Sequence, residues 1–368
     1  MNWTIVDYAQ NVLQTFDELP FNQVDSLILS CMAYVRMPSN SLPALEGWDG
    51  VPFKEVLLAE DFSSMFHTVY SAPHSKDLLC AMCASPRYRD ILIKGYTHQN
   101  DMKSSMQFSA ITFQLNKNMA YIAYRGTDAT VIGWKEDFNM AFQYPIASQE
   151  ESARYLQEAA SYVSGQLYVG GHSKGGNLAV YASMHVPSSI QERIVQIDSL
   201  DGPGFPQAVL ESSSFKHIQA KVHKTLPQSS LIGMLLEQQE DFKIVKSFRF
   251  SVWQHDPYSW EVEGYDFATI SHLTPGAKYM NRTINAWLNE ITPEERERFI
   301  LALSKILASD KAITSREFRN QIPKNLPAFF QAASDLDDDT KHFLKNTLKE
   351  MATLSIKNLH NHPKKEGA

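Results

Sequence analysis

The chain has 368 residues, of which 43% are hydrophobic and 20% are charged, and its formal net charge at pH 7 is -7. This length and apolar content support a large buried core, as in one α/β domain with an appendage, and exclude a fibre or a disordered chain. Lysines and arginines are scattered and outnumbered by acidic residues, which excludes the basic surface that nucleic acid requires. We therefore expect no nucleic acid partner.

Membrane and export signals are missing from the sequence. No apolar run approaches the ~20 residues that are needed to cross a bilayer. Residues 1–10 also lack the basic and apolar regions of a secretory signal. The sequence therefore predicts a cytoplasmic protein without a transmembrane segment, and peripheral contact with a membrane surface stays open.

The chain has three cysteines, Cys31, Cys80 and Cys83. An odd and sparse set argues against a disulfide framework and fits a reducing compartment. Cys80 and Cys83 have the CxxC spacing, but a structural zinc site needs about four ligands and the chain has no second cysteine pair. We expect this pair to pack in the core on a helix, and we predict no metal site.

In chain order, residues 1–100 come first and repeat apolar residues at intervals of three and four, which is typical of amphipathic helices. We expect them to cover one side of a sheet. Two strand-like runs follow, 106–115 and 119–127, and the turn residues between them predict a β-hairpin at the edge of that sheet.

Strands and helices alternate from Ser148 onward, as a parallel sheet requires. The predicted elements are a helix over 148–165, a strand over 166–171, a helix over 174–185, strands over 193–201, 223–227 and 242–253, and a more helical stretch over 229–240. Only helical patterns follow residue 275. We predict an α/β-hydrolase fold with a mostly parallel central sheet flanked by helices. Its domain should span 1–290, with 1–100 as helical cover and 105–270 as catalytic sheet, followed by a C-terminal helical appendage over 291–368 with a frayed tail.

The strongest motif is GHSKG, in which Ser173 lies between Gly171 and Gly175 where a strand ends and a helix begins. This GxSxG turn is a nucleophile elbow, and it presents a serine hydroxyl at the carboxyl edge of a parallel sheet. The backbone N–H of Lys174 would then lie at a helix N-terminus and face a developing oxyanion. A chance glycine-rich turn is the alternative. A phosphate loop is excluded because Gly176 and Asn177 follow where the Walker pattern needs lysine and a hydroxyl residue.

A serine hydroxyl needs a histidine to take its proton and a carboxylate to orient that histidine. In this fold the chain order is serine, acid, histidine. Asp201 ends a predicted strand and precedes Gly202-Pro203-Gly204, so we favour it as the acid. Three alternatives remain open: Asp198 within the strand, and Glu237 and Asp241 after a later one.

Four histidines downstream of Ser173 are candidates for the base: His217, His223, His255 and His272. We favour His255 because it follows the last strand-like run and precedes Pro257, on a loop that can fold over the strand ends. His272 is the reserve candidate.

The second oxyanion donor should come from a loop after an early strand, and Thr127 is our candidate. An ordinary turn residue is the alternative. Arg125 is expected to brace this loop by pairing with a carboxylate such as Asp137.

Several runs resemble known lipases. The run 124–128, YRGTD, resembles the FRGT motif of class 3 lipases, in which the residue after the glycine supplies the oxyanion donor. The run 201–204, DGPG, resembles the catalytic aspartate turn of the pancreatic lipase group. RGTDATVIGWKEDFNM, GGHSKGGNLAVYAS, DGPGF, PQSSLIGMLLE and QHDPYSW are together similar to a bacterial lipase-like α/β-hydrolase family, the Mbeg-like proteins, over residues 1–270.

The resemblance implies fold and family more than substrate. It also has one departure: class 3 lipases carry aspartate before a Val-Pro, where this chain reads HKTLP over 223–227. An acid on that later strand is therefore in doubt, which favours Asp201.

These residues predict a serine hydrolase, lipase- or esterase-like, that acts on a small-molecule or lipid ester without a cofactor. Apolar residues after the HKTLP strand are expected to form a lid or an acyl pocket, with a buried packing helix as the alternative: Leu231, Ile232, Met234, Leu235 and Leu236. A thioesterase, peptidase or acyltransferase could use the same triad, and a degenerate hydrolase fold used for binding or regulation is the alternative outside catalysis. The oligomeric state is left open.

Overall fold

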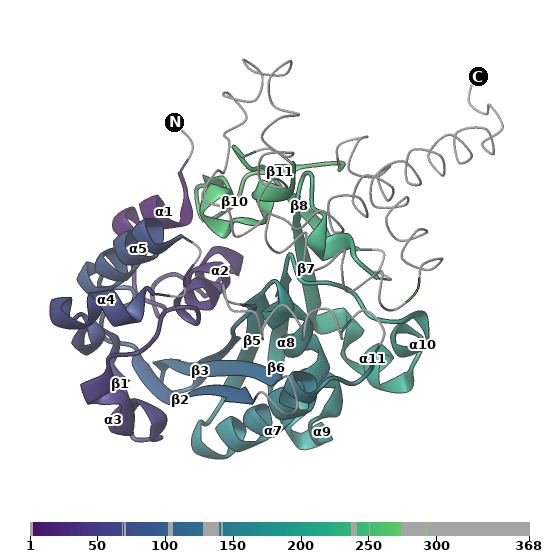
Figure 1. Ribbon diagram of the computed structural model, residues 1–368, viewed down its shortest axis with the longest axis horizontal. Coiled ribbons are helices and arrows are strands. Elements are labelled where there is room, and N and C mark those ends of the chain that lie inside the picture. Colours follow the sequence, from purple (N-terminus) through teal and green to yellow (C-terminus); the bar gives the residue numbers. More distant parts are fainter. Residues whose placement is uncertain are drawn as a thin grey trace.

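The computed structural model describes residues 3–273, except 68, 70, 102–105, 128–139, 141–142, 237–240 and 250, and also residue 292. A mixed sheet with the strand order β1-β2-β3-β4-β5-β6-β7-β8-β11 forms the centre of this part of the chain (Figure 1). Its strands are β1 (Val51–Pro52), β2 (Leu92–Asp101), β3 (Met106–Asn116), β4 (Met119–Tyr124), β5 (Gln166–His172), β6 (Ile194–Leu200), β7 (Val222–Pro227), β8 (Lys243–Val245) and β11 (Thr269–Ile270). A small separate hairpin pairs β9 (Val262–Glu263) with β10 (Asp266–Phe267).

The sheet changes direction at β4. From β4 to β8, each strand pairs parallel with the next. From β1 to β4, each strand pairs antiparallel with the next, and β11 closes the other edge antiparallel to β8. Every residue of β4 is buried, as expected for a strand that is covered on both faces. The predicted hairpin is β3 and β4, but its place at the sheet edge was wrong, because β1 and β2 extend the sheet beyond it.

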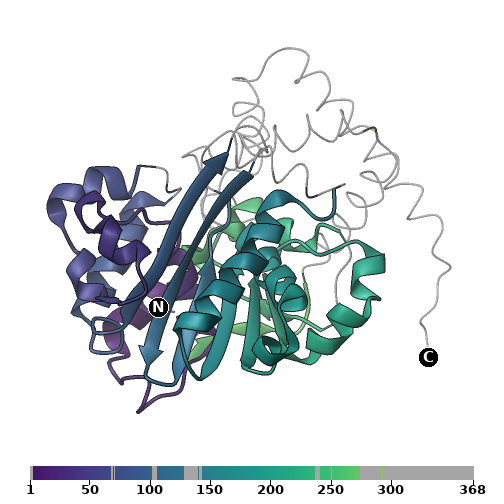
Figure 2. The ribbon, with the colours of Figure 1, turned by 90° about the horizontal axis from the view of Figure 1, so that it is seen from below.

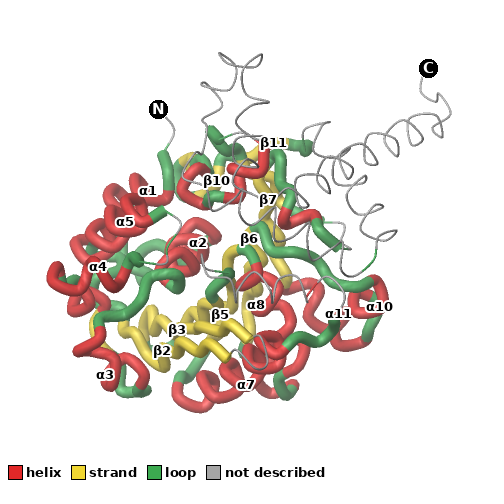
Figure 3. Tube along the Cα trace, in the orientation of Figure 1, coloured by secondary structure: helices red, strands yellow, loops and turns green. Residues whose placement is uncertain are grey.

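Helices cover both faces of the sheet, as Figures 2 and 3 show. The N-terminal helices lie on one side and the helices that alternate with the parallel strands lie on the other. They are α1 (Ile5–Asn11), α2 (Gln23–Met32), α3 (Leu42–Glu46), α4 (Phe62–Met65) and α5 (Ala72–Ala84), then α7 (Ala147–Tyr162), α8 (Lys174–His185), α9 (Ser188–Gln191), α10 (Gln207–Leu210) and α11 (Ser213–Ile218). The α/β prediction is confirmed, and the elbow at the carboxyl end of a parallel strand makes it an α/β-hydrolase fold.

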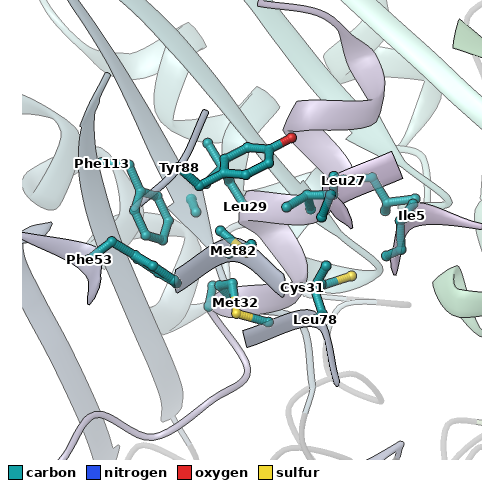
Figure 4. Close-up of a cluster of buried hydrophobic side chains, with 14 of the residues drawn as sticks. Ile5, Leu27, Leu29, Cys31, Met32, Phe53, Leu78, Met82, Tyr88 and Phe113 are labelled. Carbon is teal, nitrogen blue, oxygen red and sulfur yellow. The ribbon is translucent and has the colours of Figure 1, made fainter. Parts of the chain in front are cut away.

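The core on the N-terminal side joins helices α1, α2 and α5 to the sheet (Figure 4). Ile5, Leu27, Met82 and Phe113 are fully buried there, and each such side chain contributes about 1.5–3 kcal/mol relative to an exposed one. Sequence spacing predicted these helices as a cover. It missed β2, whose side chains lie under that cover.

A buried ion pair crosses this layer. Arg87 binds Asp25 through Nε at 2.8 Å and Nη2 at 2.6 Å, and both side chains are fully inaccessible. The same guanidinium donates to the carbonyl oxygens of Gln14 and Leu19, so it also holds the loop between α1 and α2.

The chain after β7 differs from the prediction. Only Lys243–Val245 of the expected strand 242–253 is a strand, and Ser251–His255 forms a 3-10 turn (η6). Residues 229–236 of the stretch expected to be more helical contain a short 3-10 turn over Ile232–Met234 (η5). Residues 237–240 lie outside the described residues, as does the predicted appendage over 291–368 except Thr292. Among the described helices, none is long and apolar enough to cross a membrane. The cytoplasmic address stays a prediction.

Candidate active site

The turn between β5 and α8 places Ser173 at the carboxyl edge of the sheet. Its backbone has φ 61° and ψ -132°, a conformation that L-residues rarely adopt and that clusters at functional sites. The turn is also tight, because a Cβ atom on Gly175 would lie 2.1 Å from the carbonyl oxygen of Tyr124. Glycine at this position lets α8 pack directly on the strands, and it leaves Ser173 half-buried with its hydroxyl at the strand ends.

Three side chains from distant segments meet at this edge. Nε2 of His255 lies 3.0 Å from Oγ of Ser173, and Nδ1 of His255 lies 2.6 Å from Oδ2 of Asp201. A carboxylate can only accept from Nδ1, so Nδ1 carries the proton and Nε2 is free to accept from the serine hydroxyl. The structure thus brings together the three residues predicted as nucleophile, acid and base, which we call the Ser–His–Asp cluster.

Asp201 is fixed on every side. Like Ser173, it has a positive φ, 51°, and its backbone N–H donates to the carbonyl of Thr225 at 2.8 Å. Its side chain is inaccessible, and the hydroxyl of Ser230 donates to Oδ1. The carboxylate therefore accepts one hydrogen bond on each oxygen, and its position relative to His255 is defined.

A second buried charged group lies behind the acid. Nζ of Lys224 donates to the carbonyl oxygen of Gly202 at 2.9 Å. Burial lowers the pKa of Lys224 to about 7, although the charge of Asp201 acts in the opposite direction. The lysine of the HKTLP run thus anchors the turn that follows the acid.

Of the alternative acids that the structure describes, Asp198 is held inside a strand and Asp241 is exposed. Asp198 is buried inside β6, where Gln196 donates to both of its oxygens at 2.9 Å, and burial raises the pKa of this carboxyl. Asp241 is exposed, and Glu237 lies outside the described residues. The side chains of the other candidate bases are exposed: His217, His223 and His272.

The predicted oxyanion donors lie beside the nucleophile. Lys174 is the first residue of α8 and directly follows Ser173. Thr127 is 5% exposed and follows Gly126, where a Cβ atom would lie only 3.0 Å from Cβ of Ser173. The YRGT turn is therefore packed against the elbow. Asp137, the expected partner of Arg125, lies outside the described residues.

The apolar segment after β7 borders the acid. Gly204 donates its N–H to the carbonyl of Leu235 at 2.9 Å, and Ser230 binds Asp201. The segment contains a short 3-10 turn (η5) and not the buried packing helix that was the alternative, and these bonds tie it to the turn 201–204. Its apolar side chains are half-buried: Leu231, Ile232, Met234, Leu235 and Leu236.

Two further polar groups support the site and were missed in the sequence. Asn177 on α8 donates from Nδ2 to the carbonyl of Gly204 at 2.9 Å and accepts from Gln149 at 2.7 Å. Ser230 binds the acid, as described above. No local pattern marks either residue, since the partners of their side chains lie at least 26 positions away in the chain.

The CxxC pair divides between core and surface. Cys83 is buried on α5 and Cys80 is exposed, so the prediction that both pack in the core was half right. Among the described residues, no group of three or more histidine, cysteine or carboxylate side chains could hold a metal ion.

Comparison with known proteins gives the family. The family profile described as Mbeg1-like matches residues 82–305, which is more than half of the chain and includes the whole Ser–His–Asp cluster. The chain belongs to the Mbeg1-like family. The predicted resemblance to Mbeg-like proteins is therefore confirmed. No curated relative matches this Mbeg1-like chain.

Solved structures similar to the Mbeg1-like chain include lipases. A fungal lipase–inhibitor complex is 14% identical with a TM-score of 0.36, over 67% of this chain and 86% of the other. Rhizomucor miehei lipase in its propeptide complex is 14% identical with a TM-score of 0.37, over 67% and 74%. M37 lipase is 12% identical with a TM-score of 0.35, over 58% and 69%. The fold assignment rests on the strand order and the elbow.

Proposed function

We propose that the chain is a serine hydrolase that cleaves carboxylic esters through an acyl-enzyme intermediate. One observation carries the proposal: the side chain of His255 bridges Ser173 and Asp201 with hydrogen-bond distances of 3.0 and 2.6 Å. This is the arrangement in which a histidine activates a serine and a carboxylate orients the histidine. The lipase-like family supports the same reaction class.

In the first step, Nε2 of His255 takes the hydroxyl proton of Ser173 as Oγ bonds to the ester carbonyl carbon. The carbonyl oxygen becomes an oxyanion, which the backbone N–H groups of Lys174 and Thr127 would stabilise. The positive charge that forms on His255 is balanced by Asp201. Collapse of the intermediate breaks the bond to the alcohol oxygen, and His255 returns its proton to that leaving group.

In the second step, a water molecule gives a proton to His255 and attacks the acyl carbon. The resulting intermediate collapses, the bond to Oγ breaks and Ser173 recovers its proton. The products are an acid and an alcohol, and no cofactor takes part. Electron pairs and protons are conserved over the two steps, so Ser173, His255, Asp201 and the two backbone N–H groups are sufficient for the chemistry.

The half-buried apolar segment beside Asp201 is our candidate for the acyl pocket or lid. Its members Leu231, Ile232, Met234 and Leu235 lie between full burial and full exposure, so they can contact both the protein and an acyl chain. Replacement Ile232→Ala is expected to change the ratio of rates on long and short p-nitrophenyl esters. Leu57→Ala, at an exposed leucine, is the matched control and should keep the wild-type ratio.

Fluorophosphonate labelling tests the central proposal. The purified chain, Ser173→Ala and the control Ser213→Ala, at an exposed serine on α11, are treated with the reagent and then assayed on p-nitrophenyl esters. Labelling and turnover should vanish in Ser173→Ala alone. An unlabelled and inactive wild type would contradict the proposal and favour a binding role. If the wild type is labelled and active, a panel of esters, thioesters and peptide amides separates the related activities.

A further inference from the structure

His255 depends on its backbone for its position. The ring of His255 must span from Ser173 to Asp201. The residue itself is the last of a short 3-10 turn of five residues, Ser251–His255, so its backbone needs a further anchor. Its carbonyl oxygen accepts a hydrogen bond from Nε2 of His172 at 2.9 Å. This bond ties the loop of the base to the last residue of β5, directly before the nucleophile.

His172 is a neutral ring in a closed environment. It is 4% exposed, and its ring centroid lies 4.6 Å from that of His255. Burial holds the pKa of His172 well below its usual range, and the charge of a protonated His255 lowers it further. A neutral imidazole has one N–H group, and it does not repel the cation that forms on His255 during turnover.

Tyr34 faces the other nitrogen of this ring. Its hydroxyl donates to the carbonyl oxygen of His172 at 3.2 Å and also lies 3.1 Å from Nδ1 of the same residue. Because the carbonyl oxygen of His255 can only accept, Nε2 of His172 carries the proton in the hydrogen bond between them. Nδ1 of the neutral ring is then an acceptor, and the single hydroxyl proton of Tyr34 is shared between Nδ1 and the carbonyl oxygen of His172.

We propose that His172 is a positioning residue that holds the backbone of His255 in register with Ser173 and Asp201, and that Tyr34 keeps the ring of His172 in the required tautomer. The expected loss of kcat rests on the proposed function, whereas the position of His255 relative to Asp201 does not. A displacement of about 1 Å at a reacting group can cost about 100-fold in rate. The loss of the His172 bond is therefore expected to lower kcat about 10- to 100-fold and to leave KM unchanged.

The test compares wild type with His172→Leu, His172→Gln, Tyr34→Phe and the control His185→Leu. Glutamine keeps an N–H donor at the distance of Nε2, whereas leucine has none. His185 is the last residue of α8, the helix that follows the elbow, and it binds the carbonyl of Tyr181 instead of the site. Fluorophosphonate end-point labelling counts active sites, so that kcat is expressed per labelled site. Misfolding lowers the number of sites, and mispositioning lowers the rate at each site.

A second readout needs no substrate. The proton on Nδ1 of His255, bound to Asp201 at 2.6 Å, should give a low-field resonance in protein labelled with 15N-histidine. We expect that resonance in wild type, His172→Gln and His185→Leu, and its broadening or loss in His172→Leu. Tyr34→Phe, which removes a single hydroxyl, should lower kcat per site about fivefold.

An unchanged resonance or an unchanged kcat per labelled site in His172→Leu overturns the proposal. If His172→Leu does not fold, Tyr34→Phe decides: wild-type kcat per site and a wild-type resonance in that variant overturn it. If the wild type is neither labelled nor active, the proposed hydrolase is contradicted. If the His255 resonance is nevertheless present in that wild type and lost in His172→Leu, the positioning role of His172 is supported.

Discussion

Oδ2 of Asp201 lies 2.6 Å from Nδ1 of His255, although 54 residues separate the two in the chain. The acid directly follows β6, the strand next to the one that carries the elbow, and the base comes from the turn after β8. Parallel strands bring their carboxyl ends to one edge of a sheet. This edge is therefore where a nucleophile, an acid and a base from separate segments can meet.

Replacement Asp201→Asn should abolish most of the activity. An amide cannot stabilise the imidazolium and favours the wrong tautomer of His255, so kcat is expected to fall about 1,000- to 10,000-fold. Asp198→Asn is the matched control, because this buried carboxylate lies in β6 and binds Gln196. Steady-state rates per labelled site decide between the two, and a larger loss in Asp198→Asn would contradict the assignment of the acid.

Replacement Gly126→Ala should destabilise the site. The added Cβ would lie 2.1 Å from Oη of Tyr34 and 2.6 Å from the carbonyl oxygen of His172, and overpacking of this kind costs about 1–3 kcal/mol. Gly47→Ala, whose Cβ would meet only ordinary contacts at 3.4 Å or more, should change the melting temperature little. Thermal unfolding of both variants tests this, and equal melting temperatures would refute it.

Lys224 predicts a pH dependence of stability. Its pKa is lowered from 10.5 to about 7 in the folded protein, so between these values the unfolded chain binds one more proton than the native one. The unfolding free energy should therefore rise with pH in this window, by at most about 1.4 kcal/mol per pH unit. Below pH 7 both states hold the proton, so this contribution has no slope there.

The variant Lys224→Met removes this contribution. Its advantage over wild type in unfolding free energy should be largest below pH 7 and shrink as the pH rises toward 10.5. Urea denaturation across this range measures the difference. Lys216→Met, at an exposed lysine on α11, should follow the wild-type curve, and a constant difference between Lys224→Met and wild type would contradict the expectation.

The buried ion pair predicts a large stability effect. Asp25→Asn leaves the guanidinium of Arg87 charged and inaccessible, and breaking such a pair costs about 3–5 kcal/mol. The exposed pair of Lys54 with Asp90 is the comparison, with 58% of the aspartate side chain accessible, and Asp90→Asn should cost less than about 1 kcal/mol. Chemical denaturation should separate the two variants clearly.

Local signals were sufficient for a large part of the fold. The helix predicted over 174–185 is α8 with the same bounds, and the strand over 166–171 is one residue shorter than β5. These elements have strong periodicity and a motif at their junction. The sequence missed β2 and mistook residues 229–236 for part of a helix, because the neighbours of these segments come from elsewhere in the chain.

By itself the sequence determined the family, the alternation of strand and helix, and the elbow that presents Ser173, since each is written in adjacent residues. Only the tertiary structure decided which acid and which histidine reach that serine, and that Ser230, Tyr34 and His172 surround them. Ser173 and His255 are 82 residues apart, and their contact arises from strand order and loop path. Those are set by the packing of the whole sheet, which no local pattern records.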